Sequence, residues 1–128
     1  MIFTTDLEKV WPDIVGKITA IAKRFADDCD WTEDDVYYAI QNRTACLFLN
    51  DEDESFAVCK INPHKRWGTV LFVWIAYGIN GKRERNTEFL REIARNVGAS
   101  RMVWQSPRVG FDRMPGVRRG LTTYSLEV

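Results

Sequence analysis

The stretch TVLFVWIAYGINGKRERNTEFLREIARNVGASRMVWQ, residues 69–105, decides the fold expected for this chain. Residues 69–76 are apolar or β-branched without polar alternation, which is typical of a central strand covered on both faces. After a glycine-containing turn, apolar residues at helical spacing predict a helix over residues 88–97 that ends at Gly98, and residues 101–105 predict a second buried strand. This order of strand, helix and strand predicts a parallel crossover unit.

Two helices are expected before this unit. The pattern TDLE at residues 5–8 is a capping box, and apolar residues follow it at helical spacing. Pro12 fits only near a helix start, so we expect the helix proper to begin at about Trp11. Thr32, which three acidic residues follow, predicts the start of a second helix that ends near Asn42.

A hairpin is expected between these helices and the crossover unit. Residues 44–50 and 55–61 are rich in apolar, β-branched and aromatic residues, and an acidic turn joins them. Pairing across this turn makes Cys46 and Cys59 cross-strand neighbours. We expect both thiols to be buried and reduced, because disulfides are rare inside cells. With Cys29 as an unpaired third cysteine and no C-x-x-C motif, no structural metal site is expected.

The last third of the chain completes a single domain. Residues 107–119 contain glycine and proline and predict one or two helical turns, and the alternating residues 121–128 predict a closing strand. We therefore expect one α/β domain over residues 1–128, with a mixed β-sheet and helices on both faces. The expected order is β-α-α-β-β-β-α-β-α-β, which begins with a short strand.

Charge is unevenly distributed along the chain. Residues 1–64 contain 6 Lys and Arg against 13 Asp and Glu, whereas residues 65–128 contain 12 against 5, although the net charge is +0. We interpret this asymmetry as attraction between the two halves within the fold. We expect no nucleic-acid partner, because a dedicated nucleic-acid module usually carries a net basic charge.

The sequence contains no apolar run near the ~20 residues that a membrane span needs. Its first residues, MIFTTDLEKVW, lack the basic and apolar regions of an export signal. We expect an intracellular protein without a membrane span.

A set of short motifs, taken in order and spacing, carries a family resemblance. These motifs are Val10-Trp11-Pro12, Asp34-Asp35-Val36, Phe89-Leu90-Arg91-Glu92-Ile93-Ala94 ahead of Gly98, and Arg108-Val109-Gly110-Phe111-Asp112-Arg113 ahead of Gly120. With the expected element order, they make nearly the whole chain resemble the GCN5-related N-acetyltransferase (GNAT) fold. More narrowly, the chain resembles small GNAT-like proteins encoded among bacteriophage structural genes.

The resemblance implies acetyl-CoA as the cofactor. Active members of the family carry an Arg/Gln-x-x-Gly-x-Gly/Ala loop after the cofactor strand, and its backbone amides hold the pyrophosphate. Residues 78–86 do not match this spacing, so we expect them to form a solvated, charged loop. Between acetyl-CoA and no cofactor, we therefore expect no cofactor. If acetyl-CoA does bind, the candidate residues are Ala76, Gly78, Asn80, Gly81, Lys82, Arg83, Arg85 and Asn86.

The resemblance also implies an acid and a base for acetyl transfer. In many members a glutamate near the cofactor strand and a tyrosine in the last helix take these roles. Here residues 69–76 contain no carboxylate, and Gly116 stands at the usual tyrosine position. Tyr77 and Tyr124 are the remaining candidates, and Tyr77 is preferred because it ends the cofactor strand.

Two functional hypotheses follow. The first is a phage-type accessory protein with a degenerate acetyl-CoA site, which acts through contacts with other phage or virion proteins, or with copies of itself, in the host cytoplasm or the virion. Its candidate contact residues are Arg108, Arg113, Arg118 and Arg119, which can equally form a solvated basic face. The alternative is an active acetyl-CoA-dependent N-acetyltransferase with an unusual cofactor loop.

Overall fold

The computed structural model describes residues 2–3, 6–78, 83–106, 111–120, 124 and 126–127, and gives only the backbone of residues 2, 3, 83–85 and 112. The elements follow one another as β1 (Ile2–Phe3), α1 (Leu7–Arg24), α2 (Glu33–Gln41), β2 (Cys46–Leu49), β3 (Phe56–His64), β4 (Gly68–Tyr77), α3 (Arg83–Asn96), β5 (Arg101–Trp104) and the 3-10 turn η1 (Phe111–Arg113).

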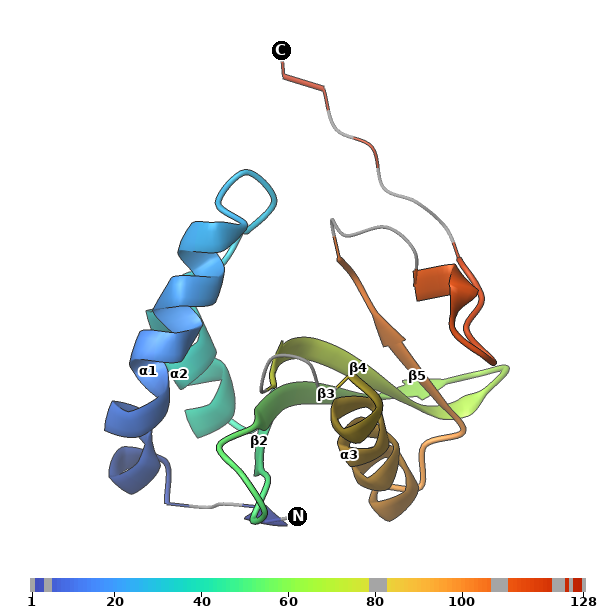
Figure 1. Cartoon of the computed structure of the whole chain (residues 1–128), viewed down its shortest axis with the longest axis horizontal. Coiled ribbons are helices and arrows are strands. Elements are labelled where there is room, and N and C mark those ends of the chain that lie inside the picture. Colours follow the sequence, from blue (N-terminus) through green and yellow to red (C-terminus); the bar gives the residue numbers. More distant parts are fainter. Residues whose placement is uncertain are drawn as a thin grey trace.

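The strands form one mixed sheet in the order β1-β2-β3-β4-β5 (Figure 1). All neighbours pair antiparallel except β4 and β5, which are parallel and joined by α3. The crossover unit predicted from residues 69–105 is therefore confirmed. The hairpin register is confirmed as well, because Cys46 lies opposite Cys59. The prediction that both thiols are buried is right for Cys59 and wrong for Cys46, which is only half-buried.

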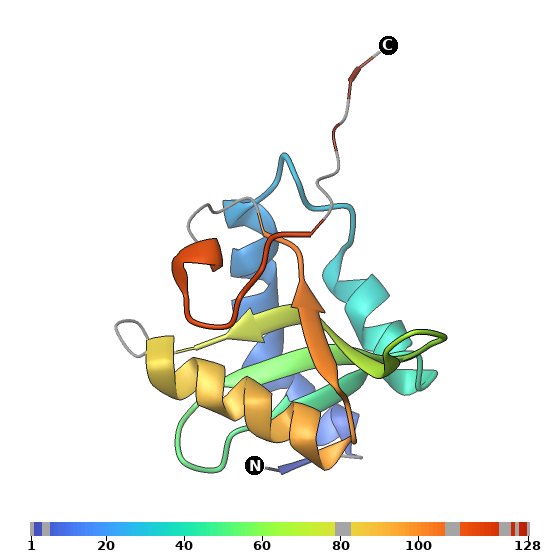
Figure 2. The same cartoon turned by 90° about the vertical axis from the view of Figure 1, so that its right-hand side faces the viewer.

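Helices cover both faces of the sheet (Figures 1 and 2). On one face α1 and α2 bury Ile18 and Val36 against Leu47, Phe56 and Val58. On the other face α3 buries Phe89 and Ile93 against Ala57, Cys59, Leu71 and Val73. Because both faces are covered, residues 69–75 of β4 are buried or half-buried, which explains their apolar sequence.

The start of the first helix differs from the prediction. α1 begins at Leu7, and Asp6 caps it by accepting a hydrogen bond from the backbone N–H of Lys9 at 3.3 Å. Pro12 therefore lies inside the helix, where it removes one backbone hydrogen bond. The turn before it stays helical because Leu7 and Val10 pack against the core.

The second helix is confirmed at both ends. Thr32 caps α2 through a complete capping box, in which its hydroxyl accepts from the Asp35 N–H at 3.3 Å and Asp35 Oδ2 accepts from the Thr32 N–H at 2.8 Å. Asn42 is the C-cap.

The predicted closing strand over residues 121–128 is not found at the positions that the structure describes. Tyr124, Leu126 and Glu127 lie outside any strand, and Tyr124 and Leu126 are 86% and 88% exposed. An alternating sequence makes a strand only where a neighbouring strand edge is available to pair with it. Residues 121–123, 125 and 128 lie outside the described residues.

Candidate functional site

A β-bulge interrupts the pairing of the two longest strands. Val58 on β3 lies opposite Ile75, but the next residue, Cys59, lies opposite Val73, so Trp74 is an extra residue on β4. Trp74 and Ile75 both pack on the α1/α2 face, as neighbouring residues do at a bulge. The sequence contained no sign of this feature, because a bulge in an all-apolar strand leaves the residue pattern unchanged.

Beyond the bulge, β4 and β5 separate. β5 ends at Trp104 opposite Val73, whereas β4 continues to Tyr77 (Figure 2). In the part of the chain that the structure describes, residues 74–77 of β4 thus have no strand partner on the side of β5. Their backbone N–H and C=O groups on that edge are available to an extended ligand that can pair with a strand.

The helix after β4 begins earlier than predicted. α3 starts at Arg83 instead of Glu88, so Arg83, Arg85 and Asn86 belong to its first turns and not to a loop. Arginine and glutamate favour helices, and this propensity extends α3 although no recognisable N-cap precedes it in the sequence. The candidates Asn80, Gly81 and Lys82 lie outside the described residues.

The end of β4 touches the first turns of α3. A Cβ built on Gly78 would overlap the side-chain carboxamide of Asn86, so the carboxamide lies directly against Gly78 and would have to rotate away from a larger residue. This contact places the N-terminal part of α3 beside the open edge of β4. A helix N-terminus favours a negatively charged ligand. The structure thus brings together three predicted cofactor residues, Ala76, Gly78 and Asn86.

Tyr77 lies at the same end of β4 but faces the other side of the sheet. Its ring stacks on Phe56 with centroids 5.4 Å apart and planes at 16°. The Lys17 ammonium lies 4.8 Å from the ring centroid and 3.4 Å from Glu54 Oε2. Tyr77 is therefore half-buried at the rim, with a packed ring. The other candidate, Tyr124, is 86% exposed, so little of its ring is held in place.

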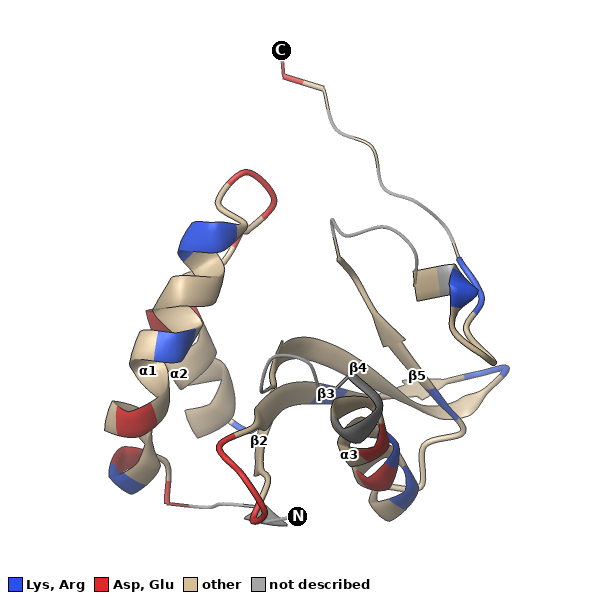
Figure 3. Cartoon of the chain, in the orientation of Figure 1, with Lys and Arg blue, Asp and Glu red and all other residues tan. Residues whose placement is uncertain are grey.

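The basic residues proposed for partner contacts lie at the far end of the chain. Arg113, Arg118 and Arg119 are exposed, and Arg108 lies outside the described residues. Figure 3 shows basic segments around η1 and the tip of the β3–β4 hairpin and acidic segments in the α1–α2 turn and the β2–β3 turn, whereas α1 carries both charges.

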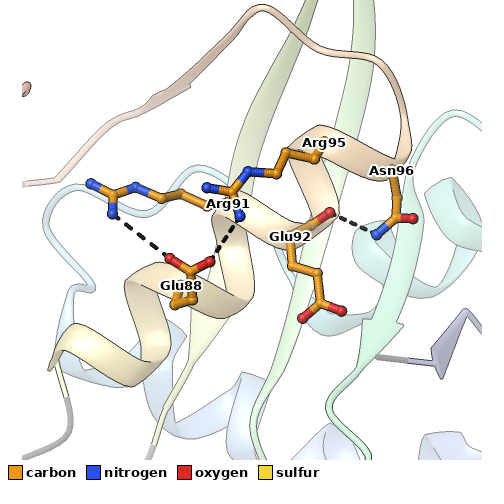
Figure 4. A network of polar contacts seen from close by, with 5 residues as sticks. All are labelled: Glu88, Arg91, Glu92, Arg95 and Asn96. Atoms are coloured by element: carbon orange, nitrogen blue, oxygen red, sulfur yellow. Dashed lines mark hydrogen bonds and ion pairs between the residues drawn. The ribbon is translucent and has the colours of Figure 1, made fainter.

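Ion pairs join residues within each half of the chain. Lys17 pairs with Glu54, and Glu88 pairs with Arg91 and Arg95 on the exposed side of α3 (Figure 4). None of these three pairs connects residues 1–64 with residues 65–128. They give no support to attraction between the halves as the reason for the uneven charge, which stays a prediction.

Two features of other protein classes are absent from the described residues. No group of three or more His, Cys, Asp and Glu side chains is placed to hold a metal ion. No described helix is long and apolar enough to cross a membrane.

The structure of this chain is similar to several solved protein structures. A protein described as a probable acetyltransferase has a TM-score of 0.59 and 12% identity, covering 97% of each chain. The ribosomal-protein-alanine N-acetyltransferase of Brucella melitensis biovar Abortus 2308 has a TM-score of 0.57 and 15% identity, covering 91% of this chain and 94% of its own. A Pyrococcus furiosus protein, also described as an acetyltransferase, has a TM-score of 0.57 and 12% identity, covering 98% and 100%.

The chain has the GNAT fold. Identities this low show the fold and do not assign an activity. No protein-family model matches the chain, and no curated protein matches it either. The bulged β4, the separated β5 and the packing of Gly78 on α3 are thus features of a GNAT-fold domain, and its function has to be argued from them.

Proposed function

We propose that this GNAT-fold domain binds acetyl-CoA in the opening between β4 and β5 and transfers the acetyl group to an amine. The observation that carries this proposal is the bulge at Trp74, beyond which residues 74–77 of β4 lack a strand partner on the β5 side. An amide-containing chain such as the pantetheine arm can pair with such an edge. The N-terminus of α3, next to Gly78, suits the phosphates.

Acetyl-CoA would supply the activated acetyl thioester, and this chain would supply orientation and proton handling. The acceptor amine must lose a proton when it attacks, and the departing thiolate must gain one. β4 carries no carboxylate. We propose the Tyr77 hydroxyl as the proton donor to the thiolate because Tyr77 ends β4; its ring stacks on Phe56 on the α1/α2 face, so the hydroxyl would reach the opening from that face. The deprotonation of the amine is left to water.

The test is a calorimetric titration of the purified protein with acetyl-CoA and with coenzyme A at moderate salt. Binding at micromolar strength, roughly 8 kcal/mol, is expected. The variant Arg83→Ala/Arg85→Ala should weaken binding by at least about tenfold, because it removes two cations near the α3 N-terminus. The variant Arg91→Ala/Arg95→Ala is the matched control, since it removes the same charge further along α3.

Equal weakening in the two double variants would mean that only the net charge matters and would contradict the assigned phosphate position. If neither ligand binds at millimolar concentration, the acetyl-CoA proposal fails.

A second candidate is the accessory role, in which the GNAT fold is a scaffold with a degenerate cofactor site in a phage or virion. The absence of a carboxylate from β4 favours it, together with the exposed Arg113 and Arg118, which belong to the segment across the molecule from the acidic α1–α2 turn. Charge separation of this kind suits contacts with other phage or virion proteins, or head-to-tail contacts between copies. The accessory role predicts that acetyl-CoA does not bind. It also predicts a complex with a partner protein that high salt weakens and that the Arg113→Ala/Arg118→Ala variant no longer forms.

A further inference from the structure

A shallow, open hollow of about 370 Å³ lies on the surface where α1 meets α2. Its lining comes from the two helices alone: Glu8, Trp11, Pro12, Asp34, Tyr37 and Tyr38. None of these residues belongs to β4, β5 or α3, so the hollow is separate from the opening proposed for acetyl-CoA.

Three aromatic rings form the wall of this hollow. Trp11 and Tyr37 meet edge to face with centroids 5.2 Å apart and planes at 68°. Tyr37 and Tyr38 do the same at 5.8 Å and 83°. Trp11 also packs against the core, whereas Tyr38 is 58% exposed. The wall is thus anchored at one end and open to solvent at the other, which leaves ring surface available to a ligand.

The charged residues of the lining are all acidic. Glu8 and Asp34 are the two carboxylates, and the lining contains no basic side chain. Asp34 lies in the first turn of α2. Aromatic ring faces attract cations, and carboxylates pair with them, so both components of the lining select the same kind of group.

We propose that the α1/α2 hollow binds an arginine side chain from a basic segment of a partner protein. A guanidinium group is planar, so it can stack on a tyrosine or tryptophan ring while its edge donates hydrogen bonds to a carboxylate. An ammonium ion is a compact point charge and uses the ring wall less fully. The occupant is therefore an arginine-bearing peptide, and the site is an interaction surface that works without the cofactor.

The experiment uses the full chain and a short acetylated and amidated peptide that contains two arginines separated by glycine. Binding is followed by calorimetry and by the NMR shift of the Trp11 indole N–H. A peptide with citrulline in place of both arginines is the neutral control and should bind at least about tenfold more weakly. A peptide with lysines should fall between the two.

Variants then locate the binding. Asp34→Asn and Tyr38→Ala should each lower the affinity for the arginine peptide by about threefold or more. Asp27→Asn is the matched control, because Asp27 is exposed in the turn after α1 and does not line the hollow, and it should change the affinity by less than about twofold. Asp34 and Tyr38 are both exposed, so these variants should remain folded, which circular dichroism checks.

Three outcomes would overturn the proposal. Equal binding of the citrulline peptide would show that the guanidinium charge is not recognised. Equal weakening by Asp27→Asn and Asp34→Asn would show general attraction to an acidic surface. Self-association that Tyr38→Ala abolishes, measured by light scattering, would assign the hollow to a second copy of this chain. Failure of acetyl-CoA to bind would leave the result unaffected, because the two sites share no residue.

Discussion

The side chain of Asn86 occupies the position where a side chain on residue 78 would begin, so any larger residue there would push the Asn86 carboxamide aside. This relationship gives a test of the site geometry. Because the overlapping atoms are the end of a side chain that can rotate, Gly78→Ala should lower the free energy of unfolding by less than about 1 kcal/mol, and should weaken acetyl-CoA binding by displacing Asn86. Denaturant unfolding and calorimetry measure the two effects.

Two further variants show whether space is the cause. Adding Asn86→Ala to Gly78→Ala should restore at least half of the lost stability, since the overlapping atoms of Asn86 are then gone. Gly16→Ala is the control for the same chemical change: a Cβ at Gly16 meets nothing within 4 Å inside α1, so this variant should gain about 0.5–1 kcal/mol. If the two alanine variants are equally stable, the contact is not tight.

Deleting Trp74 should close the proposed cofactor opening without unfolding the domain. Because Trp74 and Ile75 face the same side, the deletion leaves Ile75 and Tyr77 on the α1/α2 face and turns β4 into a regular strand. β5 can then pair further along β4, and acetyl-CoA binding should be lost. Trp74→Leu keeps the extra residue and should keep binding. Undiminished binding in the deletion variant would show that the bulge does not form the site.

Tyr77→Phe tests the assigned role of the hydroxyl group. The ring stack on Phe56 remains, so stability should change by less than about 0.5 kcal/mol. If the hydroxyl supplies the proton, kcat for acetyl transfer should fall by about 10²-fold or more while the Kd for acetyl-CoA stays the same. Steady-state kinetics and calorimetry separate the two quantities, and an unchanged kcat removes Tyr77 from the mechanism.

The buried thiol of Cys59 should make stability sensitive to high pH. Burial, with a smaller contribution from Cys46, raises the pKa of Cys59 to about 12. An unfolded cysteine has a pKa of about 8.5, so above that pH the unfolded state releases a proton that the folded state keeps. The contribution of the protonated Cys59 thiol to the free energy of unfolding is complete below about pH 8.5. Above that pH, the free energy of unfolding falls by up to about 1.4 kcal/mol per pH unit as the pH rises toward 12.

Urea unfolding of the wild type and Cys59→Ala between pH 7 and pH 10 measures this effect. The variant should be less stable at pH 7, because it leaves a cavity, but should lose less stability as the pH rises. Parallel pH dependence in the two proteins would mean that Cys59 does not contribute.

Removing the capping box should weaken α2 and the hollow that it lines. Thr32→Ala takes away the oxygen that accepts the Asp35 N–H and should cost about 1 kcal/mol in thermal or denaturant unfolding. Thr32→Ser retains an equivalent hydroxyl and should remain close to the wild type. Equal losses in both variants would attribute the effect to the methyl group instead of the cap.

Patterns that depend on neighbouring residues in sequence predicted most of the fold. The capping box at Thr32, the apolar β4 strand, the Cys46–Cys59 register and the crossover through α3 each rest on spacing within one element or across one short turn. Two of the predictions that were wrong, the start of α1 and the closing strand, both depend on contacts with distant parts of the chain. The helix around Pro12 is held by core packing, and a strand over residues 121–128 would have needed a partner edge.

The element types and their order follow from the amino-acid sequence, because hydrophobic periodicity and capping residues act over a few neighbouring positions. Tertiary structure alone placed Trp74 in a bulge, Asn86 against Gly78, and the rings of Trp11, Tyr37 and Tyr38 around one hollow. These relations depend on how far one strand slips past another and on how helices pack across a sheet. Many different sequences allow the same packing, so no local pattern of residues reports them.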